Sequence, residues 1–358
     1  MLALCLLCLS SAAAFLAPSP PGRALRAPRP AAAVDDGLPI HDVLAECLAA
    51  LDSSSGVVIE APPGAGKTTV VPRALLQHAP AWLGAEGRIV VLQPRRVAAR
   101  GAAARMAFAL GEAVGETVGY AVRRDRKSSA RTRIECVTDG VLLRRLQRDP
   151  SLAGVAAVFI DEAHERGVDA DACLALCREA QLALRPDLRL VVMSATAGGG
   201  LADAYAALLG GVPVVASDGR CFPVKVVHAD GGKPLGALLL ARSRDVADVA
   251  MAGIDRALAE TSGDVLVFLP GVAEIYATQR QLAGRARLRV LPLHAKLSPE
   301  AIDLALAAAP AAGDADDTRR RVVLATPIAE ASVTIPGVSL RSAVGRCAVL
   351  RYACSSTQ

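Results

Sequence analysis

Aromatic side chains are scarce in this sequence: they make up 3% of its 358 residues, although hydrophobic residues make up 53%. Alanine supplies much of the apolar content, which favours an α/β protein whose helices pack through small side chains and excludes a disordered chain. The length is sufficient for two domains of ordinary size. Beyond the first residues, no segment is apolar enough and long enough to cross a membrane.

Lysine is also rare, so arginine carries nearly all of the positive charge. The net charge of +5 is compatible with a phosphate-backbone partner but does not establish one. The nine cysteines are scattered and odd in number, which argues against a disulfide framework in a chain of this length. Cys173 and Cys177 lie four apart on an expected helix, and two such residues indicate small core side chains rather than a metal site.

The first 36 residues have the composition of a targeting segment. Residues 2–9 are apolar and lead into Ala12-Ala13-Ala14, a pattern typical of a secretory signal peptide. Residues 16–33 contain three arginines and no acid, as transit peptides do. Together they resemble the two-part presequence of algae with complex plastids, in which cleavage falls just before a phenylalanine such as Phe15. We therefore predict that residues 1–36 direct the chain to a plastid; plain secretion and an inaccurate start codon are the alternatives.

A β-branched run at 56–60 leads into the loop Ala61-Pro-Pro-Gly-Ala-Gly-Lys-Thr68, and a helical pattern follows. Amide groups at such a helix N-terminus converge on an anion, and the helix dipole adds to their effect. Gly64 and Gly66 allow the backbone to approach phosphate closely, while Lys67 reaches the β- and γ-phosphates and the Thr68 hydroxyl holds Mg²⁺. The residues predicted to bind nucleotide here are Gly64, Ala65, Gly66, Lys67, Thr68 and Thr69. A chance match in an Ala/Gly-rich chain is the alternative.

Strand and helix patterns alternate along the rest of the chain, which predicts parallel sheets with helices on both faces. The expected strands are 88–92, 133–137, 155–160, 188–193, 265–269, 288–293 and 321–325. The alternation breaks between 216 and 233, where glycine, proline and aspartate gather. We therefore place one domain at 37–217 and a second at 218–358. Such sheets carry their sites beyond the C-terminal ends of the strands.

Acidic residues follow the fully apolar strand at 155–160, which is expected to be buried on both faces. From that position Asp161 can reach the Mg²⁺ at the phosphate loop, and Glu162 lies where it can orient a water that attacks the γ-phosphate. Each feature has a simpler explanation by itself. Asp161 and Glu162 can cap the following turn, and Ser194 and Thr196 can cap a helix.

Taken in order, these motifs resemble those of the DEAH-box helicases. The stretches concerned are Ala-Pro-Pro-Gly-Ala-Gly-Lys-Thr, Gln-Pro-Arg-Arg, Thr-Asp-Gly, Asp-Glu-Ala-His-Glu-Arg, Ser-Ala-Thr and Phe-Leu-Pro-Gly. The resemblance is strongest to the HrpB-like branch and spans roughly residues 38–338. It implies two RecA-like domains in tandem, an ATP-dependent RNA helicase or RNA-stimulated NTPase activity with ATP (or another nucleoside triphosphate) and Mg²⁺, and single-stranded or structured RNA as partner. It identifies no protein partner.

The resemblance also implies roles for particular residues. Lys67, Glu162 and His164 are the expected catalytic residues, with Thr68 and Asp161 at the metal. His164 is expected to couple the nucleotide to Ser194 and Thr196; a buried, hydrogen-bonded histidine without such a role is the alternative. Arg123 matches an arginine that stacks on the base. The expected contacts to the RNA backbone are Arg95, Arg96, Thr138, Gly140, His294, Thr326 and Ser332. Backbone contacts carry no base information, so no sequence specificity is expected.

The second domain departs from the family pattern. Its motif Thr326-Pro-Ile-Ala-Glu-Ala-Ser332 contains Pro327, which removes an N–H donor. No element is predicted over the last twenty residues, and the Gln-Arg-x-Gly-Arg-x-Gly-Arg motif is not present up to residue 358. The chain is therefore expected to be truncated before that motif, with an incomplete second domain. Since arginine fingers contribute roughly a thousandfold or more in rate, two hypotheses remain: an RNA helicase, or a nucleotide- and RNA-binding module without turnover.

Overall fold

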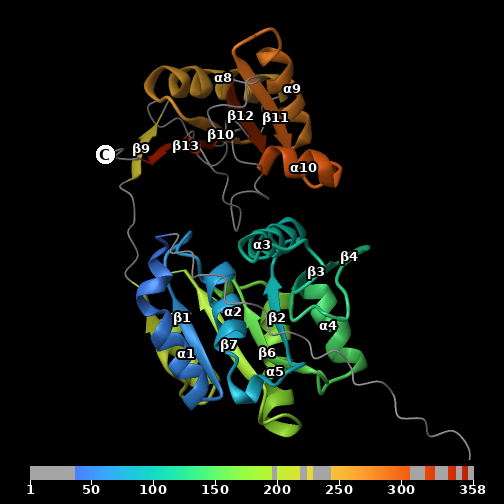
Figure 1. The fold of residues 1–358 in the computed structure, drawn as a ribbon. Coiled ribbons are helices and arrows are strands. Elements are labelled where there is room, and N and C mark those ends of the chain that lie inside the picture. Colours follow the sequence, from blue (N-terminus) through green and yellow to red (C-terminus); the bar gives the residue numbers. More distant parts are fainter. Residues whose placement is uncertain are drawn as a thin grey trace, which may run out of the picture. The chain divides into compact units, whose positions relative to one another are not determined.

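The computed structural model describes residues 37–195, 200–217, 224–228, 243–306, 319–326, 338–343 and 349–353. Their strands form two sheets, one of eight strands and one of six (Figure 1). Within these ranges, no helix combines the length and the apolar character that a membrane crossing requires. The predicted presequence lies outside the described residues.

The eight-stranded sheet has the order β4-β3-β5-β2-β6-β7-β1-β8 and is parallel except for the β3–β4 hairpin. Its strands are β1 (Gly56–Glu60), β2 (Arg88–Gln93), β3 (Val118–Val122), β4 (Asp125–Lys127), β5 (Ile134–Thr138), β6 (Val155–Ile160), β7 (Arg189–Ser194) and β8 (Val214–Ala216). The helices around it are α1 (Leu44–Ser53), α2 (Lys67–His78), α3 (Arg96–Ala109), α4 (Asp139–Arg148), α5 (Val168–Ala183) and α6 (Leu201–Leu208). Short 3₁₀ turns are η1 (Pro39–Val43), η2 (Ala81–Leu83) and η3 (Ala163–Glu165).

Alternate residues of the central strands feed two separate cores, because successive side chains of a strand point to opposite faces. In β1, Val57 and Ile59 pack with α1, α2 and α3, whereas Val58 packs with α4, α5 and α6. Cys173 and Cys177 belong to this second core as free, fully buried thiols, as predicted. Burial raises the pKa of each to about 12, so both stay protonated.

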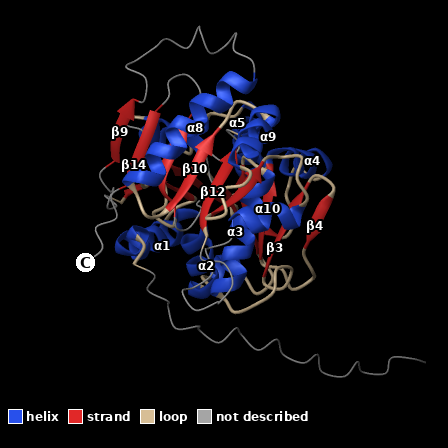
Figure 2. Ribbon diagram, turned by 90° about the horizontal axis from the view of Figure 1, so that it is seen from above, coloured by secondary structure: helices blue, strands red, loops and turns tan. Residues whose placement is uncertain are grey.

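The six-stranded sheet has the order β11-β12-β10-β13-β14-β9, in which only β14 runs antiparallel to its neighbours. Its strands are β9 (Val224–His228), β10 (Asp264–Phe268), β11 (Leu288–Leu293), β12 (Arg320–Ala325), β13 (Val338–Ala343) and β14 (Val349–Ala353). Its helices are α8 (Ser243–Glu260), α9 (Val272–Leu282) and α10 (Pro299–Leu306). Helices α8 and α9 pack on one face and α10 on the other (Figure 2). The α/β class with parallel sheets is therefore as predicted.

Two strands near the end of the chain correct the sequence analysis, which predicted no element there. Strand β13 lies parallel to β10, with Phe268 opposite Ala343, and β14 pairs antiparallel with both β13 and β9. The polar stretch Val338-Ser-Leu-Arg-Ser-Ala343 has a weak strand pattern. Pairing with the buried β10 supplies the backbone hydrogen bonds, so tertiary context decides its structure.

Candidate active site

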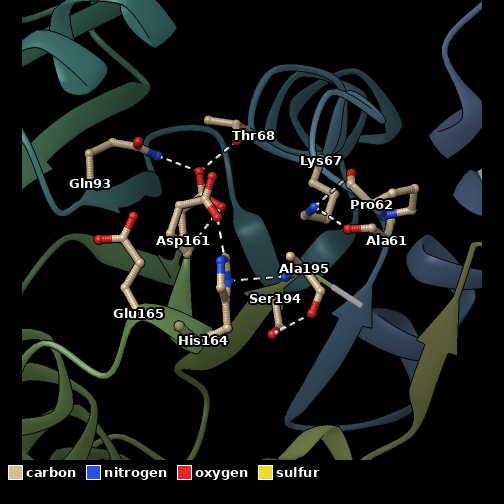
Figure 3. Close-up of polar contacts among 12 residues, drawn as sticks. Ala61, Pro62, Lys67, Thr68, Gln93, Asp161, His164, Glu165, Ser194 and Ala195 are labelled. Atoms are coloured by element: carbon tan, nitrogen blue, oxygen red, sulfur yellow. Dashed lines mark hydrogen bonds and ion pairs between the residues drawn. The ribbon is translucent and has the colours of Figure 1, made fainter. Parts of the chain in front are cut away.

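The predicted phosphate loop, the acidic pair and the Ser194 motif follow β1, β6 and β7, which are neighbours in the order β6-β7-β1. Because these strands are parallel, their C-terminal ends lie at one edge of the sheet. The side chains that follow them gather there (Figure 3). The sequence analysis predicted this convergence but not the contacts within it.

The loop before α2 has the backbone shape that close approach to phosphate requires. Gly64 and Gly66 both have positive φ, at 82° and 96°, and Gly66 is the N-cap of α2. A segment before α1 supports the loop, because the N–H of Ile40 donates to the carbonyl of Ala65 at 3.1 Å. A Cβ on Gly66 would lie 2.8 Å from Cδ1 of Leu38. The position therefore excludes a side chain for two independent reasons.

Lys67 opens α2 and is 5% exposed. Its ammonium donates to the carbonyl oxygen of Ala61 and, at 3.2 Å, to that of Pro62. Burial lowers the pKa of Lys67, while the negative charges of Asp161 and Glu162 oppose that shift. The ammonium is thus held against the first residues of the phosphate loop, where an anionic ligand would offset the free-energy cost of burying its charge.

Asp161 is the centre of the hydrogen-bond network. Its Oδ2 accepts from the Thr68 hydroxyl at 2.5 Å and from Nε2 of Gln93 at 2.6 Å, and its Oδ1 accepts from the N–H of Glu162 at 2.9 Å. Mg²⁺ prefers hard oxygen ligands and is commonly held by one or two side chains together with substrate phosphates. The hydroxyl and the carboxylate fit that requirement, and no larger cluster of metal-ligating side chains occurs in the described part of the chain.

Glu162 and His164 follow Asp161 in the chain and contact each other. Glu162 has φ 52°, an uncommon conformation for a non-glycine residue, and its Oε2 is 3.5 Å from Nδ1 of His164. The same Nδ1 accepts a hydrogen bond from the N–H of Ala195 at 3.1 Å, which places the proton of the neutral ring on Nε2. Burial lowers the pKa of His164. The charges of Glu165 and Asp161 oppose that shift and the charge of Lys67 adds to it, so the neutral form is favoured at pH 7.

The predicted coupling residues are placed differently from one another. The hydroxyl of Ser194 is buried and donates to the carbonyl of Ala195 at 3.0 Å. The contact with His164 is made by the backbone of Ala195, which the sequence analysis did not single out. Thr196 lies outside the described residues. Because the donor is a backbone N–H, which does not depend on the type of side chain, the sequence contained no signal for this contact.

Four predicted RNA contacts lie beside this network. Arg95 and Arg96 follow β2. Thr138 is the last residue of β5, and Gly140 comes two residues later. The two strands pair directly, with Gln93 opposite Thr138. Arg96 and Gly140 are exposed. The fold therefore brings the four positions to one edge, next to the acidic segment. Arg123 is exposed at the tip of the β3–β4 hairpin, which the sequence analysis did not predict as strands.

His294 and Thr326 follow the paired strands β11 and β12, and the N–H of Thr326 donates to the carbonyl of Leu293 at 3.2 Å. His294 as a whole is only 4% exposed, and its Nε2 lies 3.3 Å from the hydroxyl of Tyr276. Its Nδ1 accepts from the N–H of Lys296 at 3.3 Å. The rings of Tyr276 and His294 meet edge to face, with their centroids 5.8 Å apart, so the half-exposed Tyr276 covers the histidine. Ser332 lies outside the described residues.

Comparison with known proteins relates this arrangement to helicases. The family model "DEAD/DEAH box helicase" matches residues 42–204. The chain is 45% identical to the ATP-dependent RNA helicase HrpB of Escherichia coli over 305 residues, and the match covers 85% of this chain and 35% of that protein. It is 32% identical to the ATP-dependent RNA helicase HrpA of the same organism, over 91% of this chain and 24% of HrpA.

Solved structures agree with the sequence matches. The crystal structure of the E. coli DEAH/RHA helicase HrpB superposes with a TM-score of 0.70 at 41% sequence identity, covering 86% of this chain and 36% of that one. The chain thus spans about a third of the length of HrpB and about a quarter of that of HrpA.

Proposed function

Since residues 42–204 of the chain are a DEAD/DEAH box helicase domain, we propose that the protein binds ATP with Mg²⁺ at the ends of β1 and β6, hydrolyses it when RNA is bound, and uses the cycle to remodel RNA. The observation that carries this proposal is the contact of Thr68 with Asp161 beside a loop shaped for phosphate. The network matches the chemistry of phosphoryl transfer, which depends on positioning and charge stabilisation.

The chain's own residues supply the binding. Amides of the loop from Gly64 to Thr69 would hold the β- and γ-phosphates at the N-terminus of α2. Lys67 would exchange its hydrogen bonds to the Ala61 and Pro62 carbonyls for phosphate oxygens. Thr68 and Asp161 are the residues that would hold Mg²⁺, which when bound neutralises charge on the phosphates.

Glu162 is the residue placed to orient and deprotonate the attacking water. Its side chain is 17% exposed, so the carboxylate is sheltered but reachable from solvent. Its left-handed backbone is stored strain of the kind found at functional sites, at a cost on the order of 1–3 kcal/mol. His164 lies between this carboxylate and Ala195, and this supports a role in reporting the state of the nucleotide to the segment after β7.

RNA binding is proposed along the edge formed by β2 and β5. Arg95, Arg96, Thr138 and Gly140 would contact phosphates and sugars, which fixes the position of the strand without reading its sequence. The exposed Arg123 would stack on the base of the nucleotide from one side. A stacking contact of that kind selects weakly among bases, so we also propose that other nucleoside triphosphates serve.

A steady-state assay of phosphate release, with ATP and Mg²⁺ and with or without poly-U RNA, tests the proposal. We expect turnover that rises with RNA and is abolished in Glu162→Gln, which keeps the shape of the side chain but cannot act as a base. Binding of nucleotide and RNA with no turnover in the wild type would instead establish the module without catalysis. Absence of nucleotide binding would contradict both.

A further inference from the structure

The end of β2 and the short loop that follows it contact both ends of the acidic segment that follows β6. At one end, Gln93 donates to the carboxylate of Asp161 at 2.6 Å. At the other, Nη2 of Arg95 lies 3.7 Å from Oε2 of Glu165. Gln93, the last residue of β2, therefore holds the proposed metal ligand, and Arg95, two residues later, reaches the far end of the acidic segment.

Gln93 is buried within the site and bonded directly to one of its residues. Its side chain is 1% exposed, and a buried amide without a partner costs roughly 1–3 kcal/mol, so the hydrogen bond to Asp161 is strongly favoured. The N–H of Asp161 donates to the carbonyl of Leu92 at 3.1 Å, which continues the strand pairing up to this point. Displacement of the end of β2 would therefore rotate or shift the Asp161 carboxylate.

The segment between the two contacts has a strained backbone. Glu162, inside this segment, and Arg166, directly after it, both adopt left-handed conformations, with φ 52° and 53°. Non-glycine residues hold such conformations only where their surroundings fix them. Gln93 and Arg95 are part of those surroundings, so a change at either contact alters the restraint on Glu162.

We propose that Gln93 is a positioning residue that transmits RNA occupancy at Arg95 to the carboxylate of Asp161, and so links RNA binding to the binding of Mg²⁺–nucleotide. The inference rests on the proposed function. Arg95 is the ion-pair partner of Glu165 and also a proposed RNA contact. An RNA phosphate that draws its guanidinium away from Glu165 would move the backbone at Arg95 and, with it, Gln93, which lies two residues before. The effect reaches the nucleotide through the hydrogen bond between Gln93 and Asp161.

The effect of RNA on nucleotide affinity measures this link directly. The affinity of the full chain for mant-AMP-PNP with Mg²⁺ is determined by fluorescence titration, with and without saturating poly-U, and the ratio of the two dissociation constants is the coupling factor. We expect the wild type to show a factor of about ten, within the usual range for coupled sites. In Gln93→Met, which keeps the volume but loses the donor, we expect the factor to fall to about one. RNA affinity without nucleotide should stay unchanged.

Gln181→Met is the matched control. Gln181 is also a buried glutamine of the first sheet's layer, but its amide donates to the carbonyls of Ser55 and Leu188, which precede β1 and β7 at the opposite edge of the sheet. It should keep the wild-type coupling factor even if the protein loses stability. If Gln93→Met does not fold, Gln93→Leu removes the same donor without adding a charge beside Asp161 and should also lose the coupling.

The outcomes separate the two claims. A Gln93 variant that folds and keeps the wild-type factor overturns the inference and leaves the proposed function intact, as does a wild type that binds both ligands with a factor of one. A wild type that binds neither nucleotide nor RNA overturns the proposed function itself.

Discussion

The hydroxyl of Thr68 donates a 2.5 Å hydrogen bond to the carboxylate of Asp161, although 93 positions separate the two residues in the sequence. The contact exists because β1 and β6 flank β7 in a parallel sheet, so the loops that follow them end at the same edge. Two oxygen ligands suited to Mg²⁺ are thereby held together by the fold. The predictions below test this site and the parts of the molecule that support it.

Gly66→Ala should reduce stability and nucleotide affinity more than Gly64→Ala. Both positions have positive φ, which costs an L-residue about 1–2 kcal/mol. Only at position 66 would the new Cβ also meet other atoms, with Leu38 at 2.8 Å and Ile40 at 3.0 Å; nothing lies within 4 Å at position 64. Chemical denaturation should therefore show a larger loss of unfolding free energy for Gly66→Ala. Equal losses would mean that the segment at Leu38 does not restrain the loop.

Asp139→Asn should stabilise the protein above pH 6. Burial raises the pKa of Asp139 from 3.8 to about 6, and the negative charge of Asp169 adds to the shift. The folded state therefore holds this proton more tightly than the unfolded chain, and the favourable contribution is complete below pH 4 and lost as pH rises through 6. With partial exposure taken into account, the asparagine should add on the order of 2 kcal/mol at pH 8 and little at pH 4.

Asp149→Asn is the control, because the pKa of Asp149 is shifted in the opposite direction and the substitution should change stability with the opposite sign. The pKa of Asp149 is lowered, chiefly by the hydrogen bond from Ser151, so its contribution is present above the unfolded pKa and lost as pH falls. This variant should be less stable than the wild type at pH 8. Thermal unfolding across pH 3–8 compares the two, and a pH-independent effect of Asp139→Asn would contradict the assignment.

Asp264→Ala should be among the most destabilising substitutions in the second sheet. Asp264 and Arg321 are buried at the start of β10 and β12, and the Asp264 carboxylate accepts from Nε at 2.7 Å and from the backbone N–H of Arg321 at 3.0 Å. Removal of one partner leaves a buried charge, which costs about 3–5 kcal/mol. Asp255→Ala breaks an exposed pair with Arg285 and should cost less than about 1 kcal/mol by denaturation. Similar losses in the two variants would contradict the burial of the Asp264–Arg321 pair.

For the first 36 residues we propose delivery to a plastid, from the signal-like and arginine-containing halves around Phe15. Fusion of residues 1–36 to a fluorescent protein, expressed in an alga with a complex plastid, should place the fluorescence in that organelle. Phe15→Ala should divert it at the entry step. Fluorescence in the cytosol would refute the proposal, and secretion would leave only the signal-peptide half.

The parts of the fold that were predictable are those in which a local pattern and the tertiary environment agree. Strand β6 has the bounds predicted, because its six residues are all apolar and all buried. The phosphate loop was predictable from the requirement for glycine at positive φ before a helix. By contrast, the alternation of apolar and polar residues in β13 breaks at Arg341-Ser342, so the strand depends on its pairing with β10, and no local pattern reveals that partner.

The contacts that sequence analysis missed depend on strand order or on backbone groups. Gln93 reaches Asp161 because β2 and β6 are neighbours, and the sequence does not specify that adjacency. Ala195 contacts His164 through its N–H, which every residue except proline possesses. The contact of Tyr276 with His294 likewise depends on the packing of α9 beside β11, which no local pattern specifies.

Binding of mant-ATP in the presence and absence of Mg²⁺, compared between wild type, Lys67→Ala and Lys127→Ala, tests the account at its centre. Lys67 is buried at the phosphate loop, whereas Lys127 is an exposed lysine of β4 in the same sheet. The account predicts Mg²⁺-dependent binding that Lys67→Ala weakens at least tenfold, or about 1.4 kcal/mol, and that Lys127→Ala leaves unchanged. Equal affinity of the wild type and Lys67→Ala would contradict it.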